Sequence, residues 1–269
     1  MTTTTTAAPD LLAAIVAGTR RSLAVRRERL SEAALERRAA DRMPDSDGFA
    51  RALRQSESPR VIAECKRRSP SRGILRADYR PADHARAFAS GGAAALSILT
   101  EPTFFDGALE HLTAVRAAVD LPLLRKDFIV SRYQILEAVT AGADAVLLIV
   151  GALTDVELDE LLTEARVANL AALVEVHDEV ELQRAIDKGA AIVGVNSRNL
   201  RTLGVDPDIH MDLAAKLPKG VVAVAESGLR TKADLDRLES AGYSAFLVGE
   251  RLIVESDPGL ALGRLRGTA

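Results

Sequence analysis

The sequence predicts an α/β fold of the TIM (β/α)8 barrel class, preceded by a helical segment. After Pro59, short apolar runs rich in β-branched residues alternate with helical patterns, and eight such strand–helix pairs follow one another to the carboxyl end. Glycine and alanine recur together just before the strands, as expected where helices end. A doubly wound open sheet is the alternative fold, although no G-x-G-x-x-G motif follows any of the runs.

Composition limits the class of protein. A chain of 269 residues with a net charge of −3 can form one large barrel or two ordinary domains, and this charge balance favours neither nucleic acid nor a membrane surface as a partner. Cys65 is the one cysteine, which excludes an internal disulfide and a cysteine-only metal site and favours a cytoplasmic location. We interpret Cys65 as a small buried packing residue.

The chain before the barrel divides into two parts. Residues 1–9 form a threonine- and alanine-rich tract without the basic start and apolar centre of a secretory signal, and they are expected to be disordered. Residues 10–58 are expected to form a helical extension, and the arginine run from Arg20 to Arg29 is interpreted as a solvated helix face. Residues 59–269 are expected to form the barrel, in one structural domain with the extension.

The barrel elements follow from the alternation of apolar and helical patterns. Mostly apolar runs are typical of parallel strands that are covered on both faces. The expected strands span 61–65, 94–99, 123–125, 145–150, 171–176, 192–195, 222–225 and 245–248. The expected helices span 81–90, 108–118, 132–141, 155–168, 179–188, 209–217, 232–241 and 258–266.

The segment from Val61 to Gly73 joins the first strand to a basic loop that contains serine, proline and glycine. Residues two apart in a strand share a face, so Glu64 and Lys66 are expected to point into the barrel at the carboxyl end of the strand. Buried charges are costly unless they pair or take part in chemistry. A structural ion pair is one interpretation, whereas the loop residues Ser69 and Arg72 favour a site for an anionic ligand.

Polar residues also follow the later strands, and together they predict an active site at this end of the barrel. Each has a structural alternative, such as an ion pair between Lys126 and Asp127, although neighbours in a strand face opposite ways. The residues concerned are 100–107, 125–128, Glu175, 196–199, 226–228 and 249–251. The histidines, His84, His111, His177 and His210, occur singly and are interpreted as surface or capping residues rather than metal ligands.

The barrel segments resemble those of the indole-3-glycerol phosphate synthase family of tryptophan biosynthesis. The resemblance covers about Val61 to Leu252 and rests on these segments in family order: IAECKRRSPSRG, LSILTEPTFFDG, PLLRKDFIVSRYQI, ALVEVHDEVEL, IVGVNSRNLRTLGVD, VAESGLR and FLVGERL. The helical leader is similar to the family's amino-terminal extension. This likeness implies that the extension packs over the catalytic face of the barrel.

The resemblance implies ring closure of 1-(2-carboxyphenylamino)-1-deoxyribulose 5-phosphate, with loss of CO2 and water, to give indole-3-glycerol phosphate. Lys126 matches the lysine of the family's K-D-F motif and is the expected general acid for ring closure. Glu175 matches the family's fifth-strand glutamate and is the expected base when the ring becomes aromatic again. Lys66 with Glu64 is the expected acid for loss of the hydroxyl group, and the division of roles among these residues stays open. The scheme requires no metal or cofactor.

The remaining site residues are expected to bind the substrate. Glu226 and Asn196 are expected to hold a lysine and substrate hydroxyl groups. The phosphate is expected at the loops after the last two strands, with these residues around it: Lys66, Ser69, Arg198, Ser227, Gly228, Gly249 and Glu250. Glu250 is expected to contribute only its N–H and to turn its carboxylate away. The residues expected around the aromatic ring are Phe104, Phe105, Phe128 and Leu148.

Two other functions stay open. A barrel lyase that forms a Schiff base through Lys126 would use a similar lysine and similar phosphate loops. A degenerate barrel that binds an anionic metabolite or a partner without turnover is the alternative outside enzymes, although binding alone does not need so many opposed charges. The sequence gives no indication of oligomeric state or of association with other enzymes of the pathway.

Overall fold

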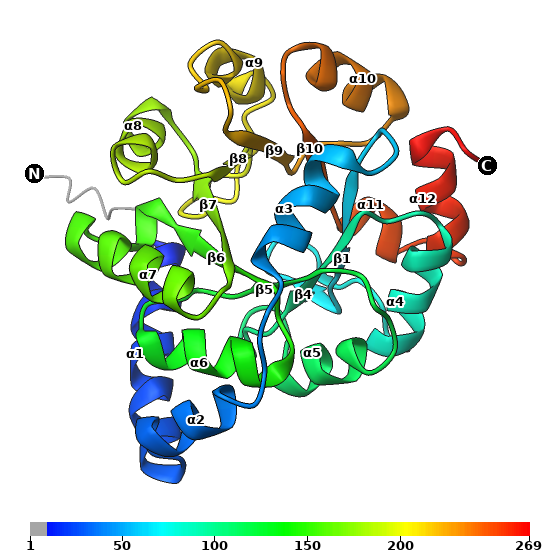
Figure 1. The fold of residues 1–269 in the computed structure, drawn as a ribbon. Helices are drawn as coiled ribbons and strands as arrows, with labels where there is room; N and C mark the ends of the chain where they lie inside the picture. The colour runs from blue at the N-terminus through cyan, green and yellow to red at the C-terminus, as the bar shows by residue number, and fades with distance from the viewer. Residues whose placement is uncertain (1–9) are drawn as a thin grey trace, which may run out of the picture.

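Eight parallel strands close into a barrel in the computed structural model, which describes residues 10–269 (Figure 1). The barrel strands are β1 (Val61–Cys65), β4 (Ala95–Leu99), β5 (Leu123–Lys126), β6 (Ala145–Ile149), β7 (Ala171–Val176), β8 (Ile192–Asn196), β9 (Val222–Glu226) and β10 (Ala245–Val248). They pair in sequence order, and β1 closes the ring against β10. The predicted fold class is confirmed, and the predicted strand limits agree within one residue. The tract of residues 1–9 lies outside the described residues.

Helices surround the barrel and cover the outer faces of the strands (Figure 1). They are α4 (Pro81–Ser90), α5 (Leu109–Arg116), α6 (Arg132–Ala141), α7 (Asp155–Val167), α8 (Glu179–Asp187), α9 (Ile209–Ala214), α10 (Lys232–Ser240) and α12 (Pro258–Arg266). Three short elements in the loops were not predicted: the hairpin of β2 (Arg68–Ser69) and β3 (Gly73–Ile74), the 3₁₀ turn η1 (Val150–Ala152) and helix α11 (Glu250–Ile253).

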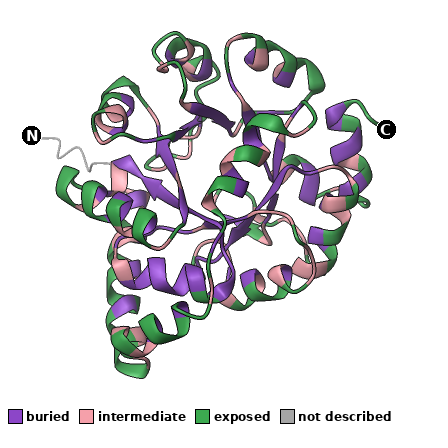
Figure 2. Ribbon diagram, in the orientation of Figure 1, coloured by how far each residue is buried: buried purple, intermediate pink, exposed green. Residues whose placement is uncertain are grey.

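Local sequence explains where these elements begin and end. Helix α7 starts with a capping box, in which the Thr154 hydroxyl accepts from the Glu157 backbone and the Glu157 carboxylate accepts from the Thr154 backbone. Helix α6 ends at Gly142, whose φ of 104° is open to glycine at little cost. Along β5, Leu124 and Lys126 face the barrel interior while Arg125 faces the helices. Burial is therefore concentrated in the strands and the inner helix faces (Figure 2).

The helical extension lies on three sides of the barrel. It consists of α1 (Leu11–Arg29), α2 (Glu32–Ala39) and α3 (Ser46–Gln55). The start of α1 lies at the carboxyl ends of the strands, as predicted, whereas α2 packs beside α6. Helix α3 crosses the opposite opening of the barrel, where Phe49 and Leu53 are fully buried and Arg54 Nη2 donates to Gly220 O at 2.7 Å (Figure 1). Of the three helices of the extension, α1 alone therefore covers the catalytic face.

The interpretation of Cys65 is confirmed, whereas that of the arginine run in α1 needs correction. Cys65 is a buried packing residue, as predicted, and burial with the nearby Glu64 carboxylate raises the pKa of its thiol. The arginine run of α1 is not simply a solvated face, because Arg26 Nη1 lies 2.7 Å from Oε2 of the buried Glu137. That pair joins α1 to α6.

No described helix has the length and apolar character needed to cross a membrane.

Candidate active site

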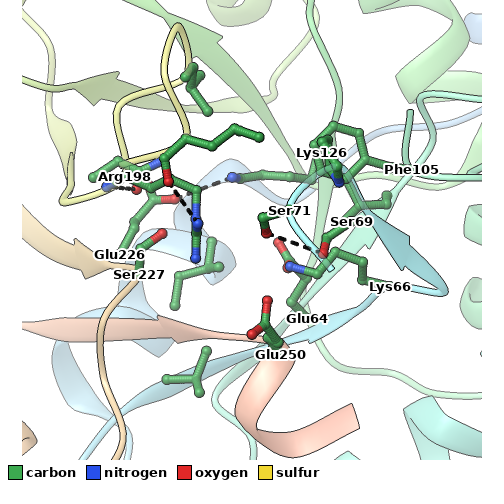
Figure 3. A pocket seen from close by; sticks show the side chains of 18 of the residues that line it. Glu64, Lys66, Ser69, Ser71, Phe105, Lys126, Arg198, Glu226, Ser227 and Glu250 are labelled. Carbon is green, nitrogen blue, oxygen red and sulfur yellow. Dashed lines mark hydrogen bonds and ion pairs between the residues drawn. The ribbon is translucent and has the colours of Figure 1, made fainter. Parts of the chain in front are cut away.

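A cavity of about 360 Å³ opens at the carboxyl ends of the barrel strands (Figure 3). Helix α1 supplies part of its wall through Leu11 and Ile15, which the sequence analysis did not single out. All the predicted catalytic residues line the cavity: Glu64, Lys66, Lys126, Glu175, Asn196 and Glu226. Most predicted binding residues do so too: Ser69, Phe128, Arg198, Ser227, Gly228, Gly249 and Glu250. The structure thus brings together residues from seven separate stretches of the chain.

Lys126 lies between two carboxylates inside the barrel. Its Nζ atom is 3.2 Å from Glu175 Oε2 and 3.3 Å from Glu226 Oε2, and the approach to Glu226 is visible in Figure 3. Asp127 faces the opposite way, with Oδ2 2.8 Å from Arg125 Nη2. This geometry excludes the structural alternative of an ion pair between Lys126 and Asp127.

The surrounding charges keep Lys126 in its ammonium form. Burial alone would lower the pKa of Lys126, but the carboxylates of Glu175, Glu226 and Glu64 outweigh burial and hold that pKa above its ordinary range. Burial likewise raises the pKa of a carboxyl group, yet Lys126 and His177 outweigh it for Glu175, whose pKa lies below its usual range. The pair is therefore a charged acid beside an ionised base.

Glu226 differs from Glu175 although both contact Lys126. Burial, together with the charge of Glu175, raises the pKa of Glu226 to about 8, against the opposing effect of Lys126. Two carboxylates that share one cation cannot both be ionised cheaply. Glu226 therefore keeps its proton to a higher pH than Glu175 does.

Gly194 makes room for the Glu226 carboxyl group. A Cβ atom at this position on β8 would lie 2.1 Å from Glu226 Oε1. We expect Gly194→Ala to displace Glu226 from Lys126 and to lower kcat/KM roughly 100-fold, since displacements of about 1 Å have such effects. Steady-state kinetics would measure the loss, and thermal unfolding would report on the fold.

Gly18→Ala is the matched control for that change. Gly18 lies within α1, and an added Cβ there has no neighbour within 4 Å. Alanine is the better helix former, so this variant should keep its activity and lose no stability. Unchanged kcat/KM in Gly194→Ala would show that the position of the Glu226 carboxyl group does not matter for turnover.

Glu64 and Lys66 form an ion pair inside the cavity, with Lys66 Nζ 2.5 Å from Glu64 Oε1. Burial opposes ionisation of Glu64, but Lys66 and Lys126 lower its pKa below the ordinary value. Gly249 leaves the space for this carboxylate, because a Cβ there would lie 2.4 Å from Glu64 Oε1. The predicted ion pair exists, and it lies within the site rather than apart from it.

The opposite wall of the cavity carries the predicted phosphate loops. Ser227 and Gly228 have φ values of 66° and 72°, a left-handed conformation that is uncommon for serine. Arg198 Nη1 donates to Leu203 O at 3.1 Å, and Asn196 Oδ1 accepts from the Arg198 backbone N–H at 3.0 Å. These bonds fix the conformation of the loop after β8, which lines the cavity.

The prediction for the Glu250 carboxylate is wrong. It does not turn away from the cavity; Oε1 lies 2.8 Å from Arg72 Nη1. The side chain stands beside the loop after β1 (Figure 3). Arg72 therefore neutralises a charge that would otherwise oppose an anionic ligand at this wall.

The apolar end of the cavity differs from the prediction at two residues. Phe105 and Phe128 line it, with ring centroids 6.2 Å apart, whereas Phe104 does not. The prediction for Leu148 is wrong, because its side chain packs in the helix layer outside the barrel. Its neighbours Leu147 and Ile149 face the cavity instead.

A buried carboxylate orders the loop that carries Phe105. Glu101 accepts from the backbone N–H groups of Thr103, Phe104 and Phe105 at 2.7–3.1 Å. The sequence analysis placed Glu101 in a polar loop but gave it no role. Glu101 precedes the three donors by two to four residues, a spacing at which an acidic side chain can cap a turn. That spacing could have indicated its role from the sequence.

The histidines were predicted to be surface or capping residues. His84 fits the second part, because its Nδ1 lies 3.3 Å from N of Arg80, the N-cap residue of α4, but the histidines are not all at the surface. His84 and His210 are buried, and His210 Nε2 lies 3.1 Å from both Val195 O and Glu226 O. His177 lies beside the site, with Nε2 3.3 Å from Glu175 Oε1. Within residues 10–269, no three or more His, Cys, Asp or Glu side chains are arranged to hold a metal ion.

The chain matches the family model of indole-3-glycerol phosphate synthase over residues 12–265. It belongs to the indole-3-glycerol phosphate synthase family. The family places this chain among the lyases, as a carboxy-lyase of tryptophan biosynthesis. The match includes α1 to α3, so the helical extension is part of the family's own fold.

Individual members of the family are similar over nearly their full length. The chain is 51% identical to an indole-3-glycerol phosphate synthase of a Nocardioides species, covering 94% of this chain and 96% of that protein. It is 48% identical to indole-3-glycerol phosphate synthase 1 of Streptomyces coelicolor, covering 95% and 94%. The similarity therefore extends over nearly the whole length of both synthases.

Solved structures with much lower identity share the barrel alone. Thiamine phosphate pyrophosphorylase from Pyrococcus furiosus superposes with a TM-score of 0.58 at 18% identity, over 78% of this chain and 94% of that one. A 3-hexulose-6-phosphate synthase gives 0.59 at 17% identity, over 78% and 99%. These likenesses show the fold, and the chemistry of this family has to be argued from its own site.

Proposed function

We propose that this chain converts 1-(2-carboxyphenylamino)-1-deoxyribulose 5-phosphate to indole-3-glycerol phosphate, CO2 and water by general acid and base catalysis. The observation that carries the proposal is the position of Lys126, with Nζ 3.2 Å from Glu175 and 3.3 Å from Glu226 inside the cavity. An ammonium group held charged beside an ionised carboxylate suits a reaction that first protonates a carbonyl oxygen and later removes a proton.

Lys126 is the proposed acid for ring closure. A ring carbon of the substrate attacks the ketone carbon, and the ketone oxygen takes a proton from Lys126 as it becomes a hydroxyl group. The raised pKa of Lys126 ensures that the proton is present before the reaction. Loss of CO2 leaves its bonding electrons in the ring system.

Glu175 is the proposed base that removes the proton lost as the indole ring becomes aromatic. Its lowered pKa keeps it ready to accept that proton. Lys66, paired with Glu64 at 2.5 Å, is the proposed acid that assists departure of the hydroxyl group as water. Asn196 and the protonated Glu226 hold substrate hydroxyl groups through neutral hydrogen bonds.

The substrate's two ends are proposed to occupy opposite walls. The phosphate binds at Ser227, Gly228 and Gly249, with Arg198 and Lys66 as cations, and the aromatic ring packs against Phe105 and Phe128. Ser69 and the backbone of Glu250 complete the phosphate site. A cytoplasmic location is part of the proposal, supported by the unpaired thiol of Cys65, which a reducing compartment preserves.

The direct test is conversion of the substrate by the purified protein without added metal or nucleotide. Fluorescence of the indole product should rise at the rate at which substrate disappears. Tight substrate binding without product would favour a degenerate barrel. Covalent trapping by borohydride at Lys126, in the presence of a sugar phosphate, would favour a Schiff-base lyase, because the proposed reaction needs no covalent adduct.

A further inference from the structure

His177 connects the proposed base to a second carboxylate outside the cavity. It follows β7 directly and is two residues beyond Glu175, so both side chains leave the strand on the same face. Its Nε2 atom is 3.3 Å from Glu175 Oε1, while Nδ1 is 2.9 Å from Glu181 Oε2. Lys126 contacts the other oxygen of Glu175. Four charged groups therefore alternate in sign from Lys126 to Glu181.

Glu181 is itself fixed by its surroundings. Its Oε2 atom also accepts from the His177 backbone N–H at 2.9 Å, and its own N–H donates to the helix cap Asp178 at 2.8 Å. Gly151 leaves room for the other oxygen, because a Cβ there would lie 2.5 Å from Glu181 Oε1. One turn along α8, Arg184 donates to the carbonyl oxygens of Val150 and Leu153 and holds α8 against the same loop.

We propose that His177, oriented by Glu181, is a positioning residue that holds the Glu175 carboxylate in its reactive orientation. This inference rests on the proposed role of Glu175 as base. Glu175 is 1% exposed and has Lys126 at one oxygen only, so the lysine alone leaves rotation of the carboxylate open. The His177 imidazole, whose Nε2 lies 3.3 Å from the other oxygen as an ion-pair partner rather than in a hydrogen bond, restricts that freedom. Fixed orientation of reacting groups accounts for large parts of enzymatic rates.

The charge of His177 agrees with this role. Burial lowers the pKa of a histidine, but the two carboxylates that face it, Glu175 and Glu181, outweigh burial and raise the pKa of His177 to about 10. The imidazole is therefore doubly protonated at neutral pH and has an N–H for each carboxylate. The Lys126 ammonium lies beyond Glu175 and does not contact the ring.

Kinetics of His177→Phe would test the inference. Phenylalanine keeps the ring but removes both N–H groups, so we expect kcat to fall about ten-fold or more while KM changes less than about two-fold. His177→Gln, which restores a donor, should recover part of the loss. His111→Phe is the matched control, since His111 does not line the cavity, and it should keep wild-type kinetics.

A double-mutant cycle separates positioning from general destabilisation. Glu181→Gln should lower kcat in the same direction, and adding it to His177→Phe should cost little further, because Glu181 reaches the Glu175 carboxylate through the imidazole. Full additivity, or a loss confined to KM, would overturn the proposal. Unchanged kcat in His177→Phe would overturn it as well.

Nuclear magnetic resonance gives a readout that does not depend on turnover. The ¹⁵N signals of His177, assigned by their absence in His177→Phe, should show both ring nitrogens protonated at pH 8. A neutral imidazole at that pH would refute the alternating charges even in an active enzyme. If the protein lacked synthase activity altogether, doubly protonated signals would support the charged chain while the proposed function failed.

Discussion

Replacement of Lys126 by methionine should reduce kcat by about 100- to 10,000-fold, the range that general acids contribute. Methionine retains the apolar stem but has no proton to give the ketone oxygen. Binding of a substrate analogue should be largely intact, because the phosphate and ring contacts lie elsewhere in the cavity. Without the ammonium, the buried Glu175 loses one of the charges that lower its pKa. We therefore expect the pKa of Glu175 to rise in this variant.

The measurement pairs kinetics with equilibrium titration of the analogue. Lys188→Met is the matched control, since Lys188 lies at the end of α8, with Nζ 3.9 Å from Asp159, and does not line the cavity. If analogue binding declines in parallel with kcat, Lys126 positions the substrate and another group supplies the proton.

The largest stability effect is expected at the neighbouring residue. Arg125 is fully buried between β5 and α6, with Nη2 2.8 Å from Asp127 Oδ2 and 3.2 Å from Glu137 Oε2. Nε donates to Thr100 Oγ1 at 3.1 Å and Nη1 donates to Gln134 O at 2.7 Å. Arg125→Met should lower the free energy of unfolding by about 3–5 kcal/mol, because it leaves buried carboxylates without their cation.

Urea denaturation would measure this change from the midpoint and slope of the transition. Arg86→Met is the control, since Arg86 forms an exposed pair with Asp83 at 2.8 Å and should cost less than about 1 kcal/mol. Equal stability of the two variants would mean that the buried network is replaceable by apolar packing.

Sequence reasoning was most successful where two regularities of the barrel combine, namely the common direction of the strands and the alternation of side chains along each strand. Parallel strands in a closed barrel bring their carboxyl ends to one place, and alternation along each strand selects the inward residue. Glu64, Lys126, Glu175, Asn196 and Glu226 therefore gather in one cavity as predicted. Their roles do not follow from this placement, because the pKa values depend on distances that only the folded chain defines.

The predictions that failed concern residues whose orientation depends on the folded structure and is not marked by an alternating pattern in the sequence. Residues 145–149 are apolar at every position, so alternation gave no sign of which ones face inward, and Leu148 was placed on the wrong side. Alternation does place His177 on the same face as Glu175, and that signal was available. Arg72, which pairs with Glu250, lies in a loop hairpin. No periodic pattern in the sequence predicts how that hairpin folds.

The extension was predicted to be helical and to lie over the catalytic face, but that path is right for the start of α1 alone, since α2 and α3 lie elsewhere. An apolar helix face indicates burial without saying which surface buries it. Leu12 and Ile15 of α1, and Phe49 and Leu53 of α3, all join the core that runs through the barrel interior, yet they enter it from opposite openings.

This arrangement bears on the order of folding during synthesis. Helix α3 is made before any barrel strand, but its contacts lie on β4, β7 and β9, and Arg54 bonds to a carbonyl 166 residues later in the chain. Phe49 and Leu53 consequently leave the ribosome with no finished surface to cover them. This early segment is therefore among the last to reach its native partners, and until then its apolar face is open to aggregation.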